Sequence, residues 1–433
     1  MNLQQPYTVQ IYQQRVLIIG LTPPPQGGIS VHIARAQTQL QRQQNQVQVL
    51  DVVRRRQTGL WCYGSYLLTL TRLLWSWRPQ QVHYHVLALW WFPVDLLILG
   101  VFRLFQGFKL LNIEHVGRYV QQRGWWYKRL ISGLFRLVDQ QVLMGWPNYY
   151  YYLQAGWLTQ SSLPAQCPGL PHQQLVDSAL TALALHPAPL LTHASVGVGP
   201  ALNAQANTPL IASPFLPPDL TQEAQLLAQY PASLQQFLAQ HAPVLLINAS
   251  RISFWRGVDV YGLDQALQLL VHLQLPDSTG TAPLAQPVGL ILMIANLDQP
   301  VYLQQLVQQA LAQLKLTCHQ PQCHWHQPGS TPRLSSGPVC QLPLFLLTGA
   351  YELWPLLKRV QLFLRPTSTD NCAVSEAEAA YFGTPTVASD VCPRLANTAL
   401  FKARDQTDLN QQVQRVLAKS LGSSKLQQVA SKV

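Results

Sequence analysis

A chain of 433 residues is longer than one ordinary hydrophobic core requires, so we expect two domains. Its hydrophobic content of 48% excludes a chain that is disordered over most of its length. The formal net charge is +11, and the excess lies in residues 1–217, which carry 15 basic and 5 acidic side chains. A basic surface of this kind attracts phosphate in nucleic acid, anionic lipid or a phosphorylated ligand.

The cellular location is expected to be cytoplasmic. The first residues lack a charged segment followed by an apolar core, and the seven cysteines are scattered, which fits a reducing compartment better than a disulfide framework. The most apolar stretch, residues 86–102, is interrupted by Pro93 and Asp95. We therefore predict a buried strand and helix there, or a membrane-facing surface, rather than a membrane span.

The first half of the chain alternates short apolar runs with helical stretches. A helix is predicted from residue 29 to about residue 42, and helical stretches separate the later runs. Strands alternating with helices predict a parallel sheet. The predicted strands are 15–20, 46–53, 81–89, 108–115 and 137–144.

The same pattern restarts in the second half, which predicts a second α/β domain. The predicted strands are 243–250, 288–296, 342–349, 360–366 and 385–390, and the predicted helices are 263–273, 302–314, 352–358 and 408–421. We expect a first domain at 1–217, a second at 218–405, and a C-terminal helix and tail at 406–433. Residues 211–242, with Pro214, Pro217 and Pro218, are predicted to link the domains.

Ligands of open parallel sheets bind beyond the carboxyl ends of the strands, so the loops there are informative. After strand 15–20 come Gly27 and Gly28, which let a backbone approach a ligand, and a helix start that attracts anions. The pattern is not GxGxxG, so no dinucleotide cofactor is implied. The two glycines are equally compatible with a simple tight turn.

Three more polar residues follow predicted strands. His115, after the fourth strand, could orient a hydroxyl group or share a proton, although a single histidine is often structural. Arg251 and Arg256, after strand 243–250, could both reach a diphosphate. The alternative is that both arginines are solvated on a loop.

An acidic cluster follows strand 360–366 in a chain with few acidic residues. Ser375 and Glu378 have the spacing of a capping box at the start of a helix, but capping does not account for Asp370. A helix N-terminus binds phosphate, and a nearby carboxylate accepts hydrogen bonds from sugar hydroxyl groups. The cluster therefore indicates a site for a phosphorylated sugar.

The same segment resembles the motif of glycosyltransferase family 4, in which two acidic residues are separated by seven others. The resemblance covers most of the chain and leaves out residues 317–340. It rests on Arg365-Pro366-Thr367, Thr369-Asp370, Glu378-Ala379, Gly383, Pro385 and Ala388-Ser389-Asp390, together with Pro25, Gly27-Gly28, His32, Tyr261-Gly262-Leu263-Asp264 and Glu352-Leu353-Trp354-Pro355.

The resemblance implies a GT-B fold, in which two Rossmann-like domains face each other across a cleft, and a retaining transfer from a nucleotide-sugar donor. It implies that Glu378 holds the ribose and Asp370 the transferring sugar. His115 matches a histidine of the cleft.

The remaining donor-binding residues also follow from the resemblance. The backbone of Ala373, Val374 and Ser375 would line the diphosphate with help from Arg251, and the loop with Gly27 and Gly28 would contact donor phosphate and acceptor. The chain departs from the family where Asp370 replaces Glu and where Arg256 loosely replaces a Lys.

No cofactor or metal is expected for the reaction, because the chain has no Asp-x-Asp sequence. Residues 317–326 contain Cys318, Cys323, His324 and His326, which could bind zinc or could belong to a surface loop.

The first half also combines basic residues with aromatic ones in 73–78, 89–92 and 118–130. This combination is typical of proteins that bind bilayer interfaces. We expect peripheral contact with an anionic inner leaflet that carries a lipid-linked acceptor. The alternative is that Trp91 and Trp126 belong to the core.

The sequence therefore favours a glycosyltransferase that modifies a saccharide or lipid-linked acceptor in surface polysaccharide or glycolipid synthesis. The main alternative is a weakly active or inactive nucleotide-sugar-binding protein with the same fold. A sugar-nucleotide epimerase is a further possibility, because a fold does not fix a function. A nucleic-acid binder is suggested only by Arg54-Arg55-Arg56 and the basic half, without a recognisable motif, so no nucleic-acid partner is expected.

Overall fold

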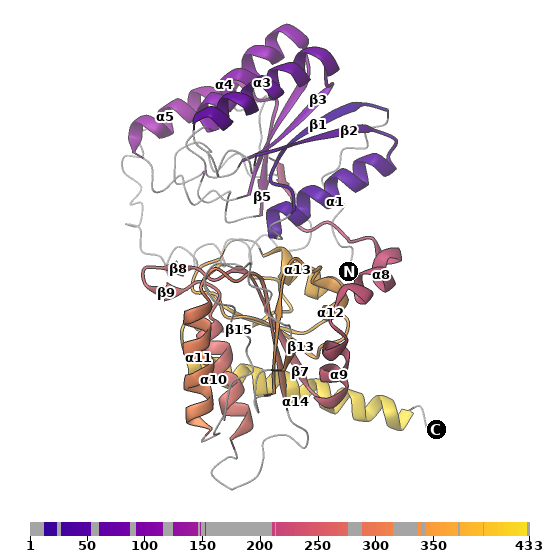
Figure 1. Ribbon diagram of the computed structural model, residues 1–433, viewed down its shortest axis with the longest axis vertical. Coiled ribbons are helices and arrows are strands. Elements are labelled where there is room, and N and C mark those ends of the chain that lie inside the picture. The colour runs from indigo at the N-terminus through magenta and orange to yellow at the C-terminus, as the bar shows by residue number, and fades with distance from the viewer. Residues whose placement is uncertain are drawn as a thin grey trace. The chain divides into compact units, whose positions relative to one another are not determined.

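The computed structural model contains two α/β units (Figure 1). Apart from residues 25–27, the first unit ends at Leu216 and the second begins at Pro217. The structure describes residues 13–23, 27–52, 60–86, 92–115, 124–145, 148, 152, 210–212, 214–275, 288–314, 337–338, 343–370, 373–392 and 394–430.

The first unit is built on a parallel sheet with the strand order β2-β1-β3-β4-β5-β6. All five predicted strands are present, but β3 ends at Val86 and β5 begins only at Gln140. The elements are β1 (Arg15–Gly20), α1 (Gly28–Arg42), β2 (Gln46–Asp51), α3 (Leu60–Trp77), β3 (Gln81–Val86), α4 (Phe92–Gln106), β4 (Lys109–Glu114), α5 (Trp125–Leu134), the 3-10 helix η2 (Phe135–Leu137), β5 (Gln140–Met144) and β6 (Leu210–Ala212).

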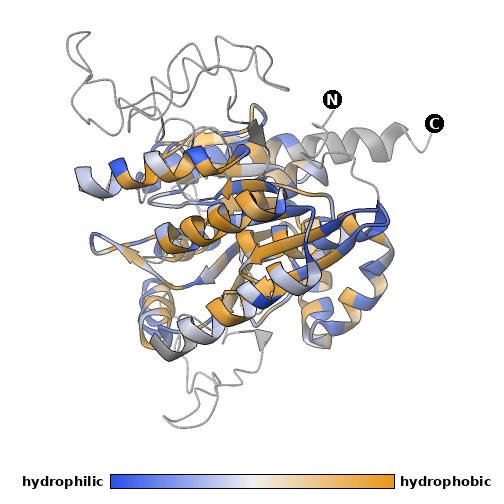
Figure 2. Ribbon diagram, turned by 90° about the horizontal axis from the view of Figure 1, so that it is seen from above, coloured by the Kyte–Doolittle hydropathy of each residue, from blue (hydrophilic) through white to orange (hydrophobic). Residues whose placement is uncertain are grey.

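Helices cover both faces of this sheet. Alternate residues of a strand point to opposite faces, so each strand can contribute to two cores. Leu17 and Ile19 of β1 join the core formed with α3, α4 and α5. Val16 and Ile18 pack instead with Ile33 of α1. Burial on both faces explains why the strands contain apolar runs in the sequence, and Figure 2 shows orange, hydrophobic strand segments inside the fold.

The interrupted apolar stretch forms part of this core. Asp95 lies on α4, is fully buried, and accepts hydrogen bonds from the hydroxyl groups of Tyr63 (3.2 Å) and Tyr84 (2.6 Å). The two tyrosines satisfy its carboxylate, so the acidic residue is compatible with a packed helix. Among the described residues, no helix combines the length and the apolar character that crossing a membrane requires.

The second unit contains a sheet with the order β11-β12-β10-β7-β13-β14-β15, parallel except for β11. All five predicted strands are present. The elements are the 3-10 helix η4 (Leu220–Gln222), α8 (Glu223–Gln229), α9 (Ala232–Gln240), β7 (Val244–Arg251), β8 (Phe254–Trp255), β9 (Val258–Asp259), α10 (Leu263–Gln274), β10 (Gly289–Asn296), α11 (Pro300–Gln313), β11 (Gly337–Pro338), β12 (Leu344–Thr348), α12 (Trp354–Leu357), β13 (Leu362–Arg365), α13 (Val374–Tyr381), β14 (Thr386–Ser389), β15 (Ala399–Phe401) and α14 (Gln406–Ala430).

Two apolar cores flank this sheet. Helices α10, α11 and α14 pack on one face, and α9, α12 and α13 contribute to the core on the other. The final helix α14 supplies Leu409, Val413 and Leu417, so it is packed into the second unit.

The prediction that residues 211–242 form a linker is wrong for most of that segment. Leu210–Ala212 pairs with β5 as the last strand of the first sheet, and Leu234 and Phe237 of α9 are buried in the second unit. These short elements were not predicted, because Pro214, Pro217 and Pro218 lie among them and prolines usually indicate turns or loops.

The backbone of the loop before α10 lies very close to the backbone of the loop after β13. Gly262 has φ 68°, and a Cβ atom added there would lie 2.0 Å from the carbonyl oxygen of Pro366. Gly257 has φ 78°, but a Cβ atom added there would meet nothing within 4 Å. The two glycines therefore share a left-handed conformation and differ in the space around them.

We predict that Gly262→Ala lowers the free energy of unfolding by about 2–4 kcal/mol, because the new methyl group adds overpacking to the backbone strain. Gly257→Ala should cost only the strain, about 1 kcal/mol. Urea unfolding followed by circular dichroism measures both. Equal losses for the two variants would contradict the close contact.

Candidate functional site

The strand order of the second sheet reverses at β7, the first strand of the second unit. From β7 the chain passes to β10 and β12 on one side, and then to β13, β14 and β15 on the other. Ligands of open parallel sheets bind at such a switch point, beyond the carboxyl ends of the strands. Arg251 ends β7, and the loop 366–373 follows the adjacent β13. The sheet thus brings together the segments that contain Arg251 and the predicted donor-binding residues of α13.

Arg394 is the centre of a buried charge network beside this switch point. Its side chain is 1% exposed. Its Nη1 atom donates to Asp370 Oδ2 at 2.9 Å and to Glu376 Oε2 at 3.0 Å. Its Nε atom donates to the carbonyl oxygen of Ser389 at 3.0 Å, and Nη2 donates to Thr367 Oγ1 at 3.0 Å. One guanidinium therefore ties the loop after β13, the first turn of α13 and the end of β14 together.

Asp370 is paired with two arginines. Arg365 donates to it through Nε (2.9 Å) and Nη2 (3.1 Å), in addition to the bond from Arg394. Burial alone would raise the pKa of Asp370, but the two guanidinium charges and their hydrogen bonds outweigh burial and hold this pKa well below its usual range. The carboxylate is therefore ionised at every physiological pH, and it accepts hydrogen bonds from both arginines of the network.

The predicted capping box at the start of α13 is wrong. The helix begins at Val374 with Ala373 as its N-cap, and no side chain caps it. Ser375 is consequently inside the helix, and the carboxylate three residues after the N-cap is that of Glu376. Instead of capping, Glu376 accepts hydrogen bonds from Arg394, from the backbone N–H of Leu395 (3.1 Å) and from Thr398 (2.7 Å).

The other predicted residues of α13 lie at the start of the helix and in its second turn. The backbone of Ala373, Val374 and Ser375 forms the helix N-terminus, where the first N–H groups have no partner within the helix. Glu378 lies one turn further along and is buried. Helix N-termini favour anions, so this end of the helix is suited to a phosphate group.

The two predicted phosphate-binding arginines are both exposed. Arg251 is at the carboxyl end of β7. Arg256 lies in the turn between β8 and β9 with φ 51°, and its guanidinium is 5.8 Å from the Trp255 ring centre. The N–H of Ser368 donates to the carbonyl oxygen of Val260 at 3.0 Å, so the loop that carries Arg256 is joined to the loop that carries Asp370.

Of the remaining predicted site residues, Gly27 groups with the second unit, whereas Gly28 and His115 belong to the first unit. Its strand order reverses between β1 and β3. Gly27 immediately precedes α1, Gly28 is the first residue of that helix, and His115 directly follows β4. Pro25 and the zinc candidates of 317–326 lie outside the described residues.

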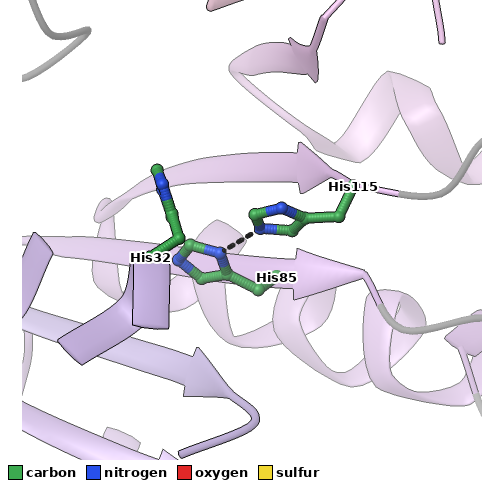
Figure 3. A group of neighbouring side chains, drawn as sticks. All are labelled: His32, His85 and His115. Carbon is green, nitrogen blue, oxygen red and sulfur yellow. Dashed lines mark hydrogen bonds between the residues drawn. The ribbon is translucent and has the colours of Figure 1, made fainter. Parts of the chain in front are cut away.

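His115 belongs to a cluster with His32 of α1 and His85 of β3 (Figure 3). His85 Nδ1 and His115 Nε2 are hydrogen-bonded at 2.8 Å, and the ring centres of His32 and His115 are 5.2 Å apart. Burial lowers the pKa of His32 to about 4 against the opposing effect of its hydrogen bond to Pro214, and burial also lowers the pKa values of His85 and His115 well below 6.5. All three rings are therefore uncharged at neutral pH.

Comparison with known proteins identifies the fold. No protein-family model and no curated protein matches the chain. Solved structures do match along nearly the whole chain. HepE of Anabaena, solved in complex with UDP-glucose, is 12% identical, covers 97% of this chain and 99% of its own, and superposes with a TM-score of 0.52.

Two further solved structures agree. Sucrose-phosphate synthase from Thermosynechococcus elongatus is 12% identical over 94% of this chain and 91% of its own, with a TM-score of 0.53. A glycosyltransferase from Rickettsia africae is 8% identical over 94% and 89%, also with a TM-score of 0.53. These likenesses confirm the predicted α/β fold, two domains with parallel sheets of the GT-B type.

The sequence analysis missed three residues of these sites. It gave no role to Arg394, and it did not associate His32 or His85 with His115. The sequence did contain a signal for Arg394. Asp370, Glu376 and Glu378 lie between apolar runs and would need cations if buried, and Arg394 is one of the few basic residues nearby in the sequence. The histidines are separated by 53 and 30 residues, so only the fold shows that they meet.

We predict that Arg394→Met lowers the free energy of unfolding by about 3–5 kcal/mol, because Asp370 and Glu376 lose a buried cation. Arg404→Met is the matched control. Arg404 pairs with Asp264 but is 38% exposed, so its loss should cost about 1 kcal/mol or less. Chemical unfolding of both variants decides the matter, and similar losses would show that the network does not stabilise the unit.

Proposed function

We propose that this chain is a glycosyltransferase that uses a nucleotide-sugar donor. The observation that carries the proposal is the fold match along nearly the whole chain to HepE, which binds UDP-glucose. The residues at the switch point of the second unit have the chemistry that such a donor requires. This agreement favours an active transferase over an inactive binding protein.

The donor diphosphate is proposed to bind between the start of α13 and Arg251. Breaking the bond between sugar and phosphate leaves negative charge on the diphosphate and oxocarbenium character on the sugar. The N–H groups at Ala373, Val374 and Ser375 and the guanidinium of Arg251 would stabilise that negative charge. Arg256 would assist from the neighbouring loop. No step of this scheme requires a metal ion or cofactor.

The ribose hydroxyl groups are proposed to donate hydrogen bonds to Glu378. The assignment of Asp370 to the transferring sugar remains a proposal, and it has a structural condition. Because Arg365 and Arg394 already occupy this carboxylate, a sugar hydroxyl would have to share it with them. Loss of activity in an Asp370 variant would therefore not separate a sugar contact from a damaged charge network.

Several finer assignments belong to the proposal and rest on the family resemblance. They are membership of family 4, retention of anomeric configuration, a saccharide or lipid-linked acceptor in polysaccharide or glycolipid synthesis, and roles of Gly27, Gly28 and His115 toward donor and acceptor. A cytoplasmic location belongs here as well. Glu378 offers the sharpest test, because it lies in α13 but is not part of the Arg394 network as its hydrogen bonds define it.

We predict that UDP raises the melting temperature of the chain and that Glu378→Gln weakens UDP binding about 10- to 100-fold, since a hydrogen bond to a charged acceptor contributes about 1.5–3 kcal/mol. Glu223→Gln is the control. The Glu223 carboxylate lies on α8 and pairs with Lys358 and Arg359, and it has no proposed contact with the nucleotide. Thermal shift and calorimetry with UDP, GDP and ADP provide the measurements.

The outcomes separate the candidate functions. Release of UDP from UDP-glucose that depends on an added acceptor supports transfer, whereas nucleotide binding without turnover supports the inactive binding protein. Conversion of UDP-glucose to a second nucleotide sugar supports an epimerase. If none of the three nucleotides binds, the proposal is wrong.

The acceptor side is proposed to contact an anionic membrane. The structure exposes apolar side chains on the outer sides of three neighbouring helices that cover one face of the first sheet. We call this set the helical apolar surface; it comprises Leu68 and Trp75 of α3, Leu97, Leu104 and Phe105 of α4, and Trp125, Trp126 and Leu130 of α5. Trp126 is 77% exposed, so the alternative of a core position does not apply to it, whereas Trp91 lies outside the described residues.

Basic side chains accompany this surface. Arg72, Arg78 and Arg129 are exposed on or directly after the same helices, and the guanidinium of Arg129 lies 5.0 Å from the ring centre of Trp125. Exposed aromatic rings beside arginines match a bilayer interface with anionic headgroups. Charge complementarity therefore favours a lipid surface that contains acidic lipids.

We predict that the chain sediments with phosphatidylcholine vesicles only when phosphatidylglycerol is included. Phe105→Ser with Trp126→Ser should reduce binding at least tenfold, since each buried aromatic side chain contributes about 1.5–3 kcal/mol. Val301→Ser with Leu400→Ser, at exposed apolar positions of the second unit, should leave it unchanged. Equal binding to both vesicle types, or by both double variants, would contradict the membrane proposal.

A further inference from the structure

The three-histidine cluster of the first unit has the arrangement of a metal site. His32, His85 and His115 each offer one ring nitrogen, and these three atoms all lie within 4.8 Å of one another. The three rings come from α1, β3 and the end of β4, and Figure 3 shows them gathered at one place in the fold. All three side chains are buried, although histidine is only moderately often found in protein interiors.

The hydrogen bonds of His32 determine which of its nitrogens can bind a metal. Its Nδ1 atom lies 2.7 Å from the carbonyl oxygen of Pro214, so Nδ1 carries the proton and donates it. The Nε2 atom of the uncharged ring therefore has a lone pair. Among the described residues, Nε2 of His32 has no hydrogen-bond partner, and neither has Nε2 of His85. A buried nitrogen that lacks a partner is costly, and a bound ion would satisfy it.

The hydrogen bond between His32 and Pro214 is also typical of a histidine that binds a metal. Histidines that bind a metal almost always donate their other ring N–H to a carbonyl or carboxylate, which fixes the ring and its tautomer. Here the backbone carbonyl of Pro214 accepts the hydrogen bond from His32 Nδ1. The acceptor is part of the main chain, so it does not depend on the identity of a side chain.

The surrounding backbone is adapted to bring the rings together. A Cβ atom added to Gly20 at the end of β1 would lie 2.4 Å from Ile33 Cδ1 and 3.2 Å from His85 Cβ, so a larger residue there would displace the Ile33 side chain of α1 and crowd His85. The end of β4 is fixed next to His115, because Asn148 Nδ2 donates to the carbonyl oxygens of Glu114 (2.9 Å) and Met144 (2.8 Å).

We propose that His32, His85 and His115 bind one divalent transition-metal ion of the class that prefers imidazole ligands, with zinc as the leading candidate. Zinc, copper and nickel bind imidazole nitrogens, whereas magnesium and calcium prefer oxygen ligands. Zinc–nitrogen bonds of about 2.0–2.1 Å place tetrahedral ligand atoms about 3.3 Å apart, so nitrogens that now lie up to 4.8 Å apart must approach each other by up to about 1.5 Å. Water would complete the coordination.

The proposed function gives His115 a role toward donor and acceptor, but no step of the proposed sugar transfer requires a metal. The proposal concerns binding alone, and it stands whether or not the chain transfers a sugar. A competing set of ligands exists in Cys318, Cys323, His324 and His326, outside the described residues, so the experiment must separate the two sets.

The test uses the full-length chain with Cys318→Ser and Cys323→Ser, which removes the thiolates of the competing set. We expect calorimetry with Zn²⁺ to give one tight site per chain and no binding of Mg²⁺. His85→Gln, made in the same chain, should weaken zinc binding at least tenfold, since even second-layer changes cost about 10- to 100-fold. His83→Gln is the control, because His83 is buried on the same strand but lies outside the cluster.

A measurement without histidine variants guards against misfolding of His85→Gln. X-ray absorption of the zinc-loaded serine variant should count three imidazole ligands and no sulfur. Absence of a tight zinc site in that variant, equal weakening by His83→Gln, or fewer than three imidazoles at the bound zinc would overturn the proposal.

Discussion

The second unit depends on a balanced set of buried charges. Two guanidinium groups, Arg365 and Arg394, face two carboxylates, Asp370 and Glu376, so the set is neutral as a whole. A buried charge without a partner is so unfavourable that each member constrains the position of the others. The loop after β13, the start of α13 and the end of β14 are consequently fixed relative to one another. The position of the start of α13, where the donor diphosphate is proposed to bind, follows from this constraint.

The network also changes the interpretation of the acidic cluster. The sequence alone suggested that Asp370 and Glu378 act as a pair on a ligand. In the structure, Asp370 and Glu376 are the residues that share a cation, and Glu378 lies one turn along the same helix. The structural role of Asp370 is thus sufficient to account for its presence. Glu378 becomes the better indicator of a sugar-binding function.

Much of the fold was predictable because strands buried on both faces need apolar runs, which leave a clear signal in the sequence. Elements that rely on distant partners left none. The three-residue β15 and the helices α8 and α9 follow prolines or polar stretches and gain their burial from the rest of the second unit. The same holds for the sites. His115 could be placed after a strand, but its neighbours His32 and His85 depend on strand register and on the approach of α1 at Gly20.

The central position of β7 has a consequence for the biosynthesis of the second unit. This strand is the first of its sheet to leave the ribosome, but one of its two neighbours, β13, pairs Phe363 with Leu246 and is translated more than a hundred residues later. Contacts between such distant segments slow folding, and strands that await a partner are prone to associate with other chains. We infer that the nascent second unit exposes an unpaired edge of β7 during most of its translation, so a chaperone that shields strand edges would benefit its yield.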